Sequence, residues 1–407
     1  MAVRGLLLKR SRMCYNAMQG EAFMMKRHWL TAALLILSLL MIAAAMAEED
    51  DIAGRVAAMS LREKVGQLFV IRPDALEGRF GPAELEDNGV TGATEVTDEM
   101  RETYARYPCG GFALFRKNIL GPDQLRAFTE GLHGLNALTP LLAIDEEGGS
   151  IARIANHPAG FGVRKFPTMS EMAASGNEQQ AYELGKTIGA YLREYGIDVD
   201  FAPVADVNTN PRNTVIGSRA FGDQPAVAAR MVRKVVEGLH ASGVASCVKH
   251  FPGHGDTTAD THTGYAETRK TWEEMRACEM LPFRAGIAAG TEMVMTAHIA
   301  APNVTGGSEP STMSSVMLTG KLRGELGYQG LIITDALSMG AIRNQYSSSE
   351  ACVQCLLAGA DLLLMPYDYF EAFDGVVRAV EDGRIPEERI DESVGRVLRF
   401  KRERMGV

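Results

Sequence analysis

The sequence predicts an α/β fold, a single (β/α)8 barrel of the TIM type, and three observations support this prediction. Short, continuous apolar runs alternate with helical patterns along the chain, and such runs are typical of strands buried on both faces. Eight runs of this kind occur. Charged residues follow directly after several of them, as they do at the functional face of a barrel. A doubly wound open sheet is the main alternative.

The expected strands are spread over most of the chain, and the first one follows a short helix. Ser60 and Glu63 form a capping-box pattern that starts this helix. The expected strands are residues 65–71, 111–115, 141–144, 199–203, 245–249, 293–297, 331–334 and 361–365. Residues 72–107 are polar, rich in glycine and helical near Thr97, so we expect a long loop or lid after the first strand.

Helical patterns fill the intervals between the strands, and several carry start or stop residues. Pro122 and Pro225 stand at first turns, whereas Gly196, Gly243 and Gly359 follow last turns. The expected helices are residues 122–138, 178–195, 225–242, 272–289 with an interruption at Pro282, 317–326, 348–357, 374–382 and 389–402.

The first 47 residues are expected to be an export signal. Lys26-Arg27-His28 precede the apolar stretch 29–47, which ends in Ala-Met-Ala, and this order is that of a Sec-type signal. Cleavage after Ala47 would leave residues 48–407 as the barrel, in an exported protein of the periplasm, cell envelope or medium. Met24 or Met25 is a candidate start. The alternative is an uncleaved membrane anchor, because the apolar run is nearly long enough to span a bilayer.

Residues 48–407 are acidic and contain an odd number of cysteines. They carry 36 basic and 50 acidic residues, a net charge of −14, which argues against a nucleic-acid or anionic-membrane partner. The five cysteines are not a disulfide framework. Cys352 and Cys355 share one face of an expected helix, which favours core packing over a redox or metal role.

Several polar residues stand at or just past the end of an expected strand. In a barrel these ends form one face, so residues far apart in the sequence converge on one opening. Asp335 follows such a strand and is interpreted either as a helix N-cap or as a nucleophile of the kind that retaining glycoside hydrolysis uses. The strand-end residues are Asp145, Asp206, Lys249, His250, His298 and Asp335.

The stretch 246–262 holds three histidines, a lysine and two aspartates within a loop that Pro252 and Gly253 keep from being helical. Asp260 and His262 have the spacing of a dyad in which a carboxylate orients an imidazole for proton transfer. A metal site at His250, His254 and His262 is the alternative, but the helical i,i+4 geometry is excluded. A loop-shaping role is expected for His254 and Asp256.

Two other polar segments follow expected strands. Asp145 and Arg153 stand eight residues apart, and a carboxylate beside a guanidinium can hold adjacent sugar hydroxyls. A surface ion pair is the simpler interpretation. Arg219 is a lone cation in the second half of an Asn- and Gly-rich loop, where turn residues dominate. Neither segment is specific by itself.

Together these motifs resemble glycoside hydrolase family 3, and within it the β-N-acetylhexosaminidase (NagZ-like) branch. The resemblance covers residues 55–400. It lies in Lys-His-Phe-Pro-Gly-His-Gly-Asp-Thr at 249–257, the following Asp260-x-His262, Asp-x-Glu-Gly-Gly at 145–149, the loop with Arg219, and Thr-Asp-x-Leu-x-Met at 334–339. Thr261 departs from the usual Ser, Glu146 from Gln and Ser150 from Arg. The family's barrel can be irregular.

The resemblance implies roles for individual residues. Asp335 would be the nucleophile and His262 the acid/base, assisted by Asp260. The non-reducing sugar would be held by Asp145, Arg153, Arg219, Lys249 and His250. No metal or cofactor is implied.

The implied activity is retaining exo-β-N-acetylglucosaminide hydrolysis, on fragments derived from peptidoglycan or chitin. The alternatives are a β-glucosidase or other exo-glycosidase, a glycoside phosphorylase, a non-catalytic sugar-binding barrel and a metal-dependent hydrolase. The dyad and the absence of a second domain argue against a β-glucosidase.

Overall fold

The computed structural model describes residues 37–38, 49, 51–87, 89–258, 260–261 and 264–407. The chain divides into two compact units, Met1–Ala58 and Met59–Val407. In the first unit, residues 51–58 are helical, and the expected export segment 29–47 lies outside the described residues apart from positions 37 and 38. Within the described residues, no helix has the length and apolar character needed to cross a membrane. The following paragraphs concern the second unit.

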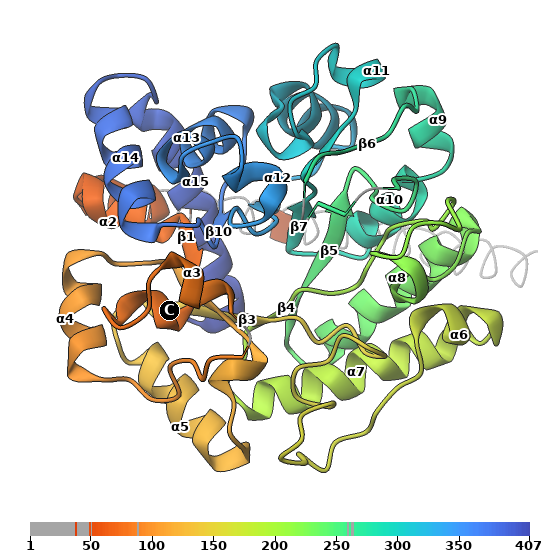
Figure 1. Ribbon diagram of the computed structural model, residues 1–407, viewed down its shortest axis with the longest axis horizontal. Helices are drawn as coiled ribbons and strands as arrows, with labels where there is room; N and C mark the ends of the chain where they lie inside the picture. Colours follow the sequence, from red (N-terminus) through yellow and green to blue (C-terminus); the bar gives the residue numbers. More distant parts are fainter. Residues whose placement is uncertain (1–36, 39–48, 50, 88, 259, 262–263) are drawn as a thin grey trace, which may run out of the picture. The chain divides into compact units, whose positions relative to one another are not determined.

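The second unit is a nearly closed barrel of parallel strands with helices around it, which confirms the predicted fold class (Figure 1). Its strands are β1 (Phe69–Ile71), β2 (Gly111–Leu114), β3 (Leu141–Ile144), β4 (Val199–Asp200), β5 (Ala245–Phe251), β7 (Met293–Thr296), β9 (Leu331–Thr334) and β10 (Leu363–Leu364). Sheet neighbours follow the chain order, β10 pairs with β1, and a parallel bridge joins Ile333 to Leu362. A doubly wound sheet would instead reverse its strand order.

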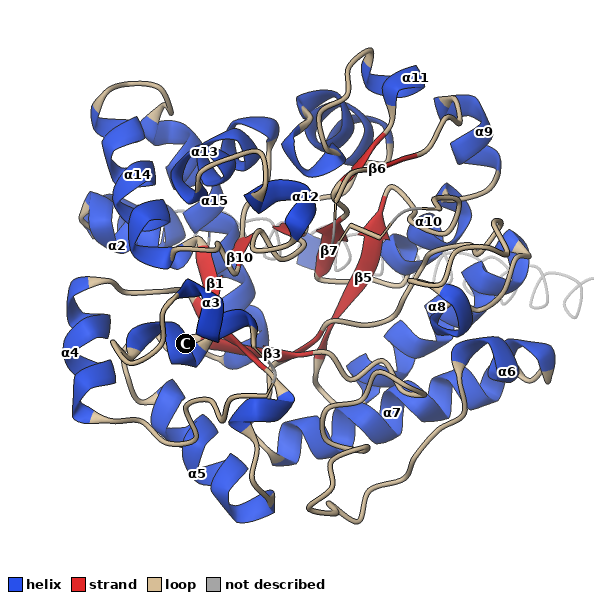
Figure 2. Cartoon of the chain, in the orientation of Figure 1, coloured by secondary structure: helices blue, strands red, loops and turns tan. Residues whose placement is uncertain are grey.

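Alternate residues of the strands fill the barrel interior, which lies inside the ring of helices (Figure 2). Successive side chains of a strand point to opposite faces, so Leu141 and Ala143 belong to the interior, whereas Leu142 and Ile144 turn to the helices. The interior cluster includes Val70, Ala113, Leu141, Ala143, Val199, Ala245, Cys247, Met293, Met295, Leu331, Ile333 and Leu364. Because this interior is packed, chemistry is left to the strand ends and loops.

The longer helices lie close to the predicted positions. The helices are α2 (Leu61–Gln67), α3 (Pro82–Glu86), α4 (Asp98–Arg106), α5 (Pro122–His133), α6 (Met169–Ala174), α7 (Glu178–Glu194), α8 (Pro225–Ala241), α9 (Trp272–Ala277), α10 (Met280–Ala288), α11 (Pro302–Thr305), α12 (Gly340–Arg343), α13 (Ser348–Ala358), α14 (Tyr369–Glu381) and α15 (Glu387–Phe400). Of these, α3, α6, α11 and α12 were not predicted. The helix expected at 317–326 is a π-helix, Val316–Glu325. On α13, Cys352 and Cys355 are free thiols buried in the core, as their spacing predicted.

Local chemistry explains where the elements depart from the predicted bounds. The capping box of Ser60 and Glu63 starts α2 at Leu61, as expected, but the helix continues to Gln67, so the first strand begins later than expected. The helix expected at 272–289 breaks at Cys278, four residues before Pro282, because a proline ring clashes with the carbonyl four residues earlier. The barrel is irregular at β5, where the register shifts between Val248 and Phe251.

The segment expected as a long loop after the first strand is more structured than predicted. Residues Pro73–Leu76 form a short 3-10 helix, and α3 and α4 follow. Thr97 caps α4 through its side-chain oxygen, which accepts the N–H of Met100. The segment thus presents a folded surface beside the barrel opening.

Candidate active site

A cavity of about 910 Å³ opens at the carboxyl ends of the strands. The predicted site residues among the described part of the chain all line this cavity: Asp145, Arg153, Arg219, Lys249, His250, Asp260 and Asp335. They come from different strands and loops, as expected for a barrel opening. His262 lies outside the described residues. His298 is not in the lining, and its Nε2–H donates instead to the carbonyl of Ala336 at 2.9 Å.

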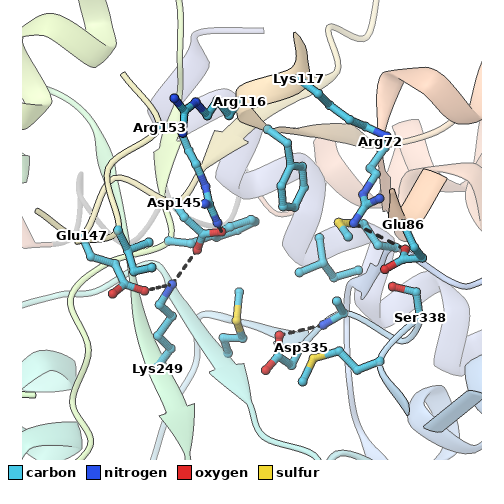
Figure 3. A pocket seen from close by; sticks show the side chains of 18 of the residues that line it. Arg72, Glu86, Arg116, Lys117, Asp145, Glu147, Arg153, Lys249, Asp335 and Ser338 are labelled. Atoms are coloured by element: carbon cyan, nitrogen blue, oxygen red, sulfur yellow. Dashed lines mark hydrogen bonds and ion pairs between the residues drawn. The ribbon is translucent and has the colours of Figure 1, made fainter. Parts of the chain in front are cut away.

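A charged cluster of two carboxylates and three cations lines the cavity, and Figure 3 shows Asp145, Glu147, Arg153 and Lys249 of this cluster on one side of it. Lys249 Nζ lies 2.6 Å from Asp145 Oδ1 and 2.7 Å from Glu147 Oε1. Arg219 holds Glu147 through two hydrogen bonds, of 2.9 Å from Nε and 2.6 Å from Nη2. Arg153 Nη2 lies 3.3 Å from Asp145 Oδ2. The charged cluster, defined as these five residues, presents donors and acceptors side by side, as adjacent sugar hydroxyls require.

The two carboxylates of the cluster are held ionised, although Glu147 is buried and Asp145 is half-buried. Burial opposes the charged form of Glu147, but Lys249 and Arg219 outweigh it and lower the pKa of Glu147 to about 2. The same balance, with Lys249 and Arg153 as the cations, holds the pKa of Asp145 well below its usual range. Conversely, Asp145 and Glu147 outweigh the burial of Lys249 and raise the pKa of its amine.

A tight hairpin after β3 positions both carboxylates. The chain turns at Gly148 and Gly149, whose φ angles of 91° and 56° disfavour any residue with a side chain. An antiparallel bridge between Gly148 and Ile151 returns the chain toward Arg153. Glu146 is buried below the hairpin, where its carboxylate accepts the N–H groups of Ile154 at 2.9 Å and Ala155 at 2.8 Å.

Glu147 is a site residue that the sequence did not single out. It stands two residues after Asp145 in a run of three carboxylates, and that run at a strand end was the available signal. Three neighbouring carboxylates on a buried edge require cations nearby, and Arg219 and Lys249 supply them.

Asp206 orients His250, which lies near the carboxyl end of β5. Asp206 Oδ2 lies 2.7 Å from His250 Nδ1, so this nitrogen carries the proton and Nε2 remains for a ligand. Oδ1 of the same carboxylate accepts the N–H of His254 at 2.6 Å. His254 in turn bonds Thr257 at 2.9 Å and Thr261 at 3.2 Å, which is the loop-shaping role expected for it. Asp256 likewise accepts from Thr268 at 2.9 Å.

Asp335 follows β9 directly and is half-buried in the cavity lining. Its N–H donates to Thr296 of the neighbouring strand at 2.9 Å, and Oδ1 accepts the N–H of Ala336 at 2.8 Å. The next helix, α12, starts at Gly340 with Met339 before it, so the helix N-cap interpretation of Asp335 is wrong. Figure 3 shows Asp335 between Lys249 on one side of the cavity and Ser338 on the other.

Candidate metal ligands do not gather in the described part of the chain. There, no group of three or more His, Cys, Asp or Glu residues is arranged to hold a metal ion. The rings of His250 and His254 lie 6.4 Å apart at an angle of 74°, and each is engaged by loop contacts.

Comparison with known families identifies the barrel. Residues 60–400 match the family described as glycosyl hydrolase family 3, N-terminal domain. The chain belongs to glycosyl hydrolase family 3. This membership confirms the resemblance seen in the motifs.

Individual relatives of the chain carry the name β-hexosaminidase. The chain is 34% identical over 336 residues to β-hexosaminidase A of Pseudoalteromonas piscicida, covering 76% of this chain and 56% of that protein. It is 31% identical to the β-hexosaminidase LpqI of Mycobacterium tuberculosis, covering 86% of this chain and 84% of the relative.

A solved structure of the same family superposes on the barrel. It is a family 3 β-N-acetylglucosaminidase from Paenibacillus, with a TM-score of 0.77 and 39% identity. The alignment covers 86% of this chain and 63% of the Paenibacillus chain. The chain therefore spans less than two thirds of that protein and of the Pseudoalteromonas relative.

Proposed function

We propose that this chain is a retaining exo-β-N-acetylglucosaminidase, which hydrolyses terminal non-reducing N-acetyl-β-glucosaminides. The observation that carries the proposal is the shared cavity of Asp335 and the charged cluster, with a carboxylate at the end of β9 beside groups suited to sugar hydroxyls. The names of the related β-hexosaminidases and of the Paenibacillus enzyme support the choice of N-acetylglucosamine.

The reaction would proceed through a covalent glycosyl-enzyme. A carboxylate oxygen of Asp335 attacks the anomeric carbon while His262, assisted by Asp260, gives a proton to the departing glycosidic oxygen. His262 then takes a proton from water, whose oxygen displaces Asp335 from the anomeric carbon and releases the sugar. In this scheme Asp260 holds the imidazole in orientation and stabilises its protonated form.

The charged cluster and His250 would bind the non-reducing ring. Asp145 accepts hydrogen bonds from sugar hydroxyls, whereas Arg153, Arg219 and Lys249 donate hydrogen bonds to the hydroxyl oxygens. Because the cluster stays ionised when buried, its hydrogen bonds to a sugar are charge-assisted, which roughly doubles their strength.

Export of the protein is part of the proposal. The order of Lys26-Arg27-His28, the apolar stretch 29–47 and its small-residue end supports a signal peptide over residues 1–47, followed by the catalytic barrel at 48–407. An exported enzyme of this kind would meet glycans of the cell wall or chitin fragments. Retention of the segment as an anchor is the alternative.

The decisive experiment compares two aryl glycosides. We expect hydrolysis of an aryl N-acetyl-β-glucosaminide at least about a hundredfold faster than of the aryl β-glucoside, with no sugar 1-phosphate formed when phosphate is added. Asp335→Asn should lose this activity by about 10⁴-fold or more, whereas the exposed Glu381→Gln should keep it. Preference for the glucoside would favour a β-glucosidase, and sugar 1-phosphate a phosphorylase. Binding without turnover would reject enzymatic function.

A further inference from the structure

A second arginine–carboxylate pair lines the same cavity on the side away from the charged cluster. Arg72 Nη2 lies 3.4 Å from Glu86 Oε1, much as Arg153 lies 3.3 Å from Asp145. Figure 3 shows Arg72, Glu86 and Ser338 together on the wall opposite Asp145 and Lys249, with Asp335 between the two sides.

One aromatic ring stands between the two pairs. The guanidinium of Arg72 lies 4.6 Å from the ring centre of Phe115, and that of Arg153 lies 5.5 Å from the same centre. Stacking on a ring face fixes a planar guanidinium and leaves its edge for hydrogen bonds. Phe115 therefore holds two binding arginines in one cavity.

Arg72 and Ser338 have buried donors without a hydrogen-bond partner in the described part of the chain. The Arg72 side chain is 9% exposed, yet its Nε and Nη1 have no hydrogen-bond partner among the described residues. Ser338 Oγ, in a residue that is 2% exposed, is likewise unpartnered there. Buried donors without acceptors are costly, and a ligand that brings oxygen atoms to them removes that cost.

The wall that carries Arg72 and Glu86 is anchored from both sides. Asp74, two residues after Arg72, is fully buried and accepts from Ala93 and, at 3.0 Å, from Asn118 Nδ2. Lys117 Nζ donates to the carbonyl of Leu85, next to Glu86, at 3.0 Å. Both residues are thus held in place before any ligand arrives, as a binding site requires.

The cavity also has more room than one sugar ring needs. Its volume of about 910 Å³ lies near the upper end of the roughly 300–1,000 Å³ of pockets that bury drug-sized ligands. A single pyranose in the charged cluster would leave the Arg72 wall open, with a row of polar groups beyond Asp335.

We propose that Arg72, Glu86 and Ser338 form a second sugar subsite, which binds hydroxyls of the ring that leaves on cleavage. This inference rests on the proposed function. A hydroxyl both donates and accepts, so it suits a guanidinium beside a carboxylate. Glu86 balances the charge of Arg72, which favours a neutral ring over an anionic one. The segment after β1, which carries Arg72 and Glu86, thus has the role of favouring substrates whose leaving group is a sugar.

The kinetic test compares a β-linked N-acetylglucosamine disaccharide with the aryl N-acetyl-β-glucosaminide, whose leaving group has no sugar hydroxyls. Arg72→Met should lower the ratio of disaccharide to aryl kcat/KM by about tenfold or more, and Ser338→Ala by a few-fold. The control is Arg116→Met, which removes an exposed cation from the same cavity rim and should leave the ratio unchanged. An unchanged ratio in Arg72→Met, or an equal fall in Arg116→Met, overturns the subsite.

A binding measurement separates this proposal from the proposed function. In an Asp335→Asn background, calorimetry should show the disaccharide bound at least about tenfold more tightly than N-acetylglucosamine, and Arg72→Met should abolish that advantage. If the advantage is seen while wild type hydrolyses neither glycoside, the subsite stands and the proposed activity fails. If the advantage is absent while hydrolysis occurs, the activity stands and the subsite is rejected.

Discussion

Glu147 and Lys249 form an ion pair of 2.7 Å in which both side chains are only 2% exposed. Neither charge depends on the other alone, because Lys249 also contacts Asp145 and Glu147 also contacts Arg219. Removing water from such charges is costly unless each keeps its partners. The pair is therefore a structural requirement of the cavity as well as a part of its surface.

Glu147→Gln should lower the free energy of unfolding by about 3 kcal/mol, because it leaves the buried cations Lys249 and Arg219 with one carboxylate fewer. Urea unfolding followed by circular dichroism measures this. Glu381→Gln is the matched control, since Glu381 is exposed at the end of α14, and it should change stability by less than about 0.5 kcal/mol. Equal stability of the two variants would contradict the role of the pair.

The carboxylate of Glu147 should also make the stability of the protein sensitive to acid. Burial opposes its charge, but Lys249 and Arg219 lower the pKa of Glu147 from 4.5 to about 2 in the folded protein. A lowered folded pKa gives stability that is complete above the unfolded value and is lost as pH falls toward the folded value. Glu147 should contribute about 3 kcal/mol to the free energy of unfolding at pH 7, and about 2 kcal/mol of this contribution should be lost between pH 7 and pH 3.

Unfolding of wild type and Glu147→Gln at pH 7, 4.5 and 3 tests this. The difference in unfolding free energy between the two proteins should shrink as the pH falls, since the variant has no carboxylate to protonate. A difference that stays constant to pH 3, or grows, would show that the pKa of Glu147 is not lowered in the folded protein.

Glu146 should act as a support for the hairpin that carries Asp145 and Arg153. Its carboxylate accepts three hydrogen bonds, from two backbone N–H groups and from Tyr191 Oη at 2.7 Å. Glu146→Ala leaves these buried donors unpaired and should cost about 3 kcal/mol or more of unfolding free energy. It should also raise KM for the aryl glycoside, because the hairpin loses its support.

Two milder variants make the Glu146 prediction specific. Glu146→Gln keeps one acceptor oxygen in the same place and should cost less than half as much as the alanine variant. Tyr191→Phe removes one donor and should cost about 1 kcal/mol. If Glu146→Gln is as unstable as Glu146→Ala, the contacts of the carboxylate are not what holds the hairpin.

The arrangement of strands could be predicted because each strand is encoded by a short local pattern. Short apolar runs that end at or next to a charged residue mark β3 and β9 without reference to the rest of the chain. Parallel strands then bring Asp145 and Asp335 to one opening, although 190 positions separate their numbers. The topology of the strands therefore predicts that these residues share one cavity, without knowledge of their contacts.

The roles of Glu147, Asp206 and Arg72 could not be predicted in this way. Glu147 depends on Arg219, which lies 72 positions away, and Asp206 on His250, which lies 44 positions away. A local sequence pattern does not show which distant residue will be the partner. The role of Arg72 follows from donors that have no partner among the residues the structure describes, and that is a property of the packed structure. The predicted proton-transfer residue His262 lies outside the described residues and stays a prediction.

Asp206 should set the working form of His250. Its carboxylate is fully buried and accepts from His250 Nδ1 at 2.7 Å, which keeps Nε2 as the nitrogen available to substrate. The Asp206 carboxylate accepts from His250 Nδ1 and from the backbone N–H of His254. In Asp206→Asn the amide presents an N–H₂ group to at least one of these two donors, so the imidazole loses its fixed tautomer. We expect KM for the aryl glycoside to rise about tenfold, with a smaller change in kcat.

If Asp206 only shaped the loop, Asp206→Asn would not change the tautomer of His250. Asp256→Asn is the matched control, because Asp256 contacts Thr209 and Thr268 in the same loop and does not contact His250. It should change KM by less than about twofold. Nitrogen-15 spectra of the histidines should show His250 protonated at Nδ1 in wild type and in Asp256→Asn, and a mixture of tautomers in Asp206→Asn. Wild-type KM in Asp206→Asn, or an unchanged tautomer, would mean that Asp206 serves the backbone of His254 and not the ring of His250.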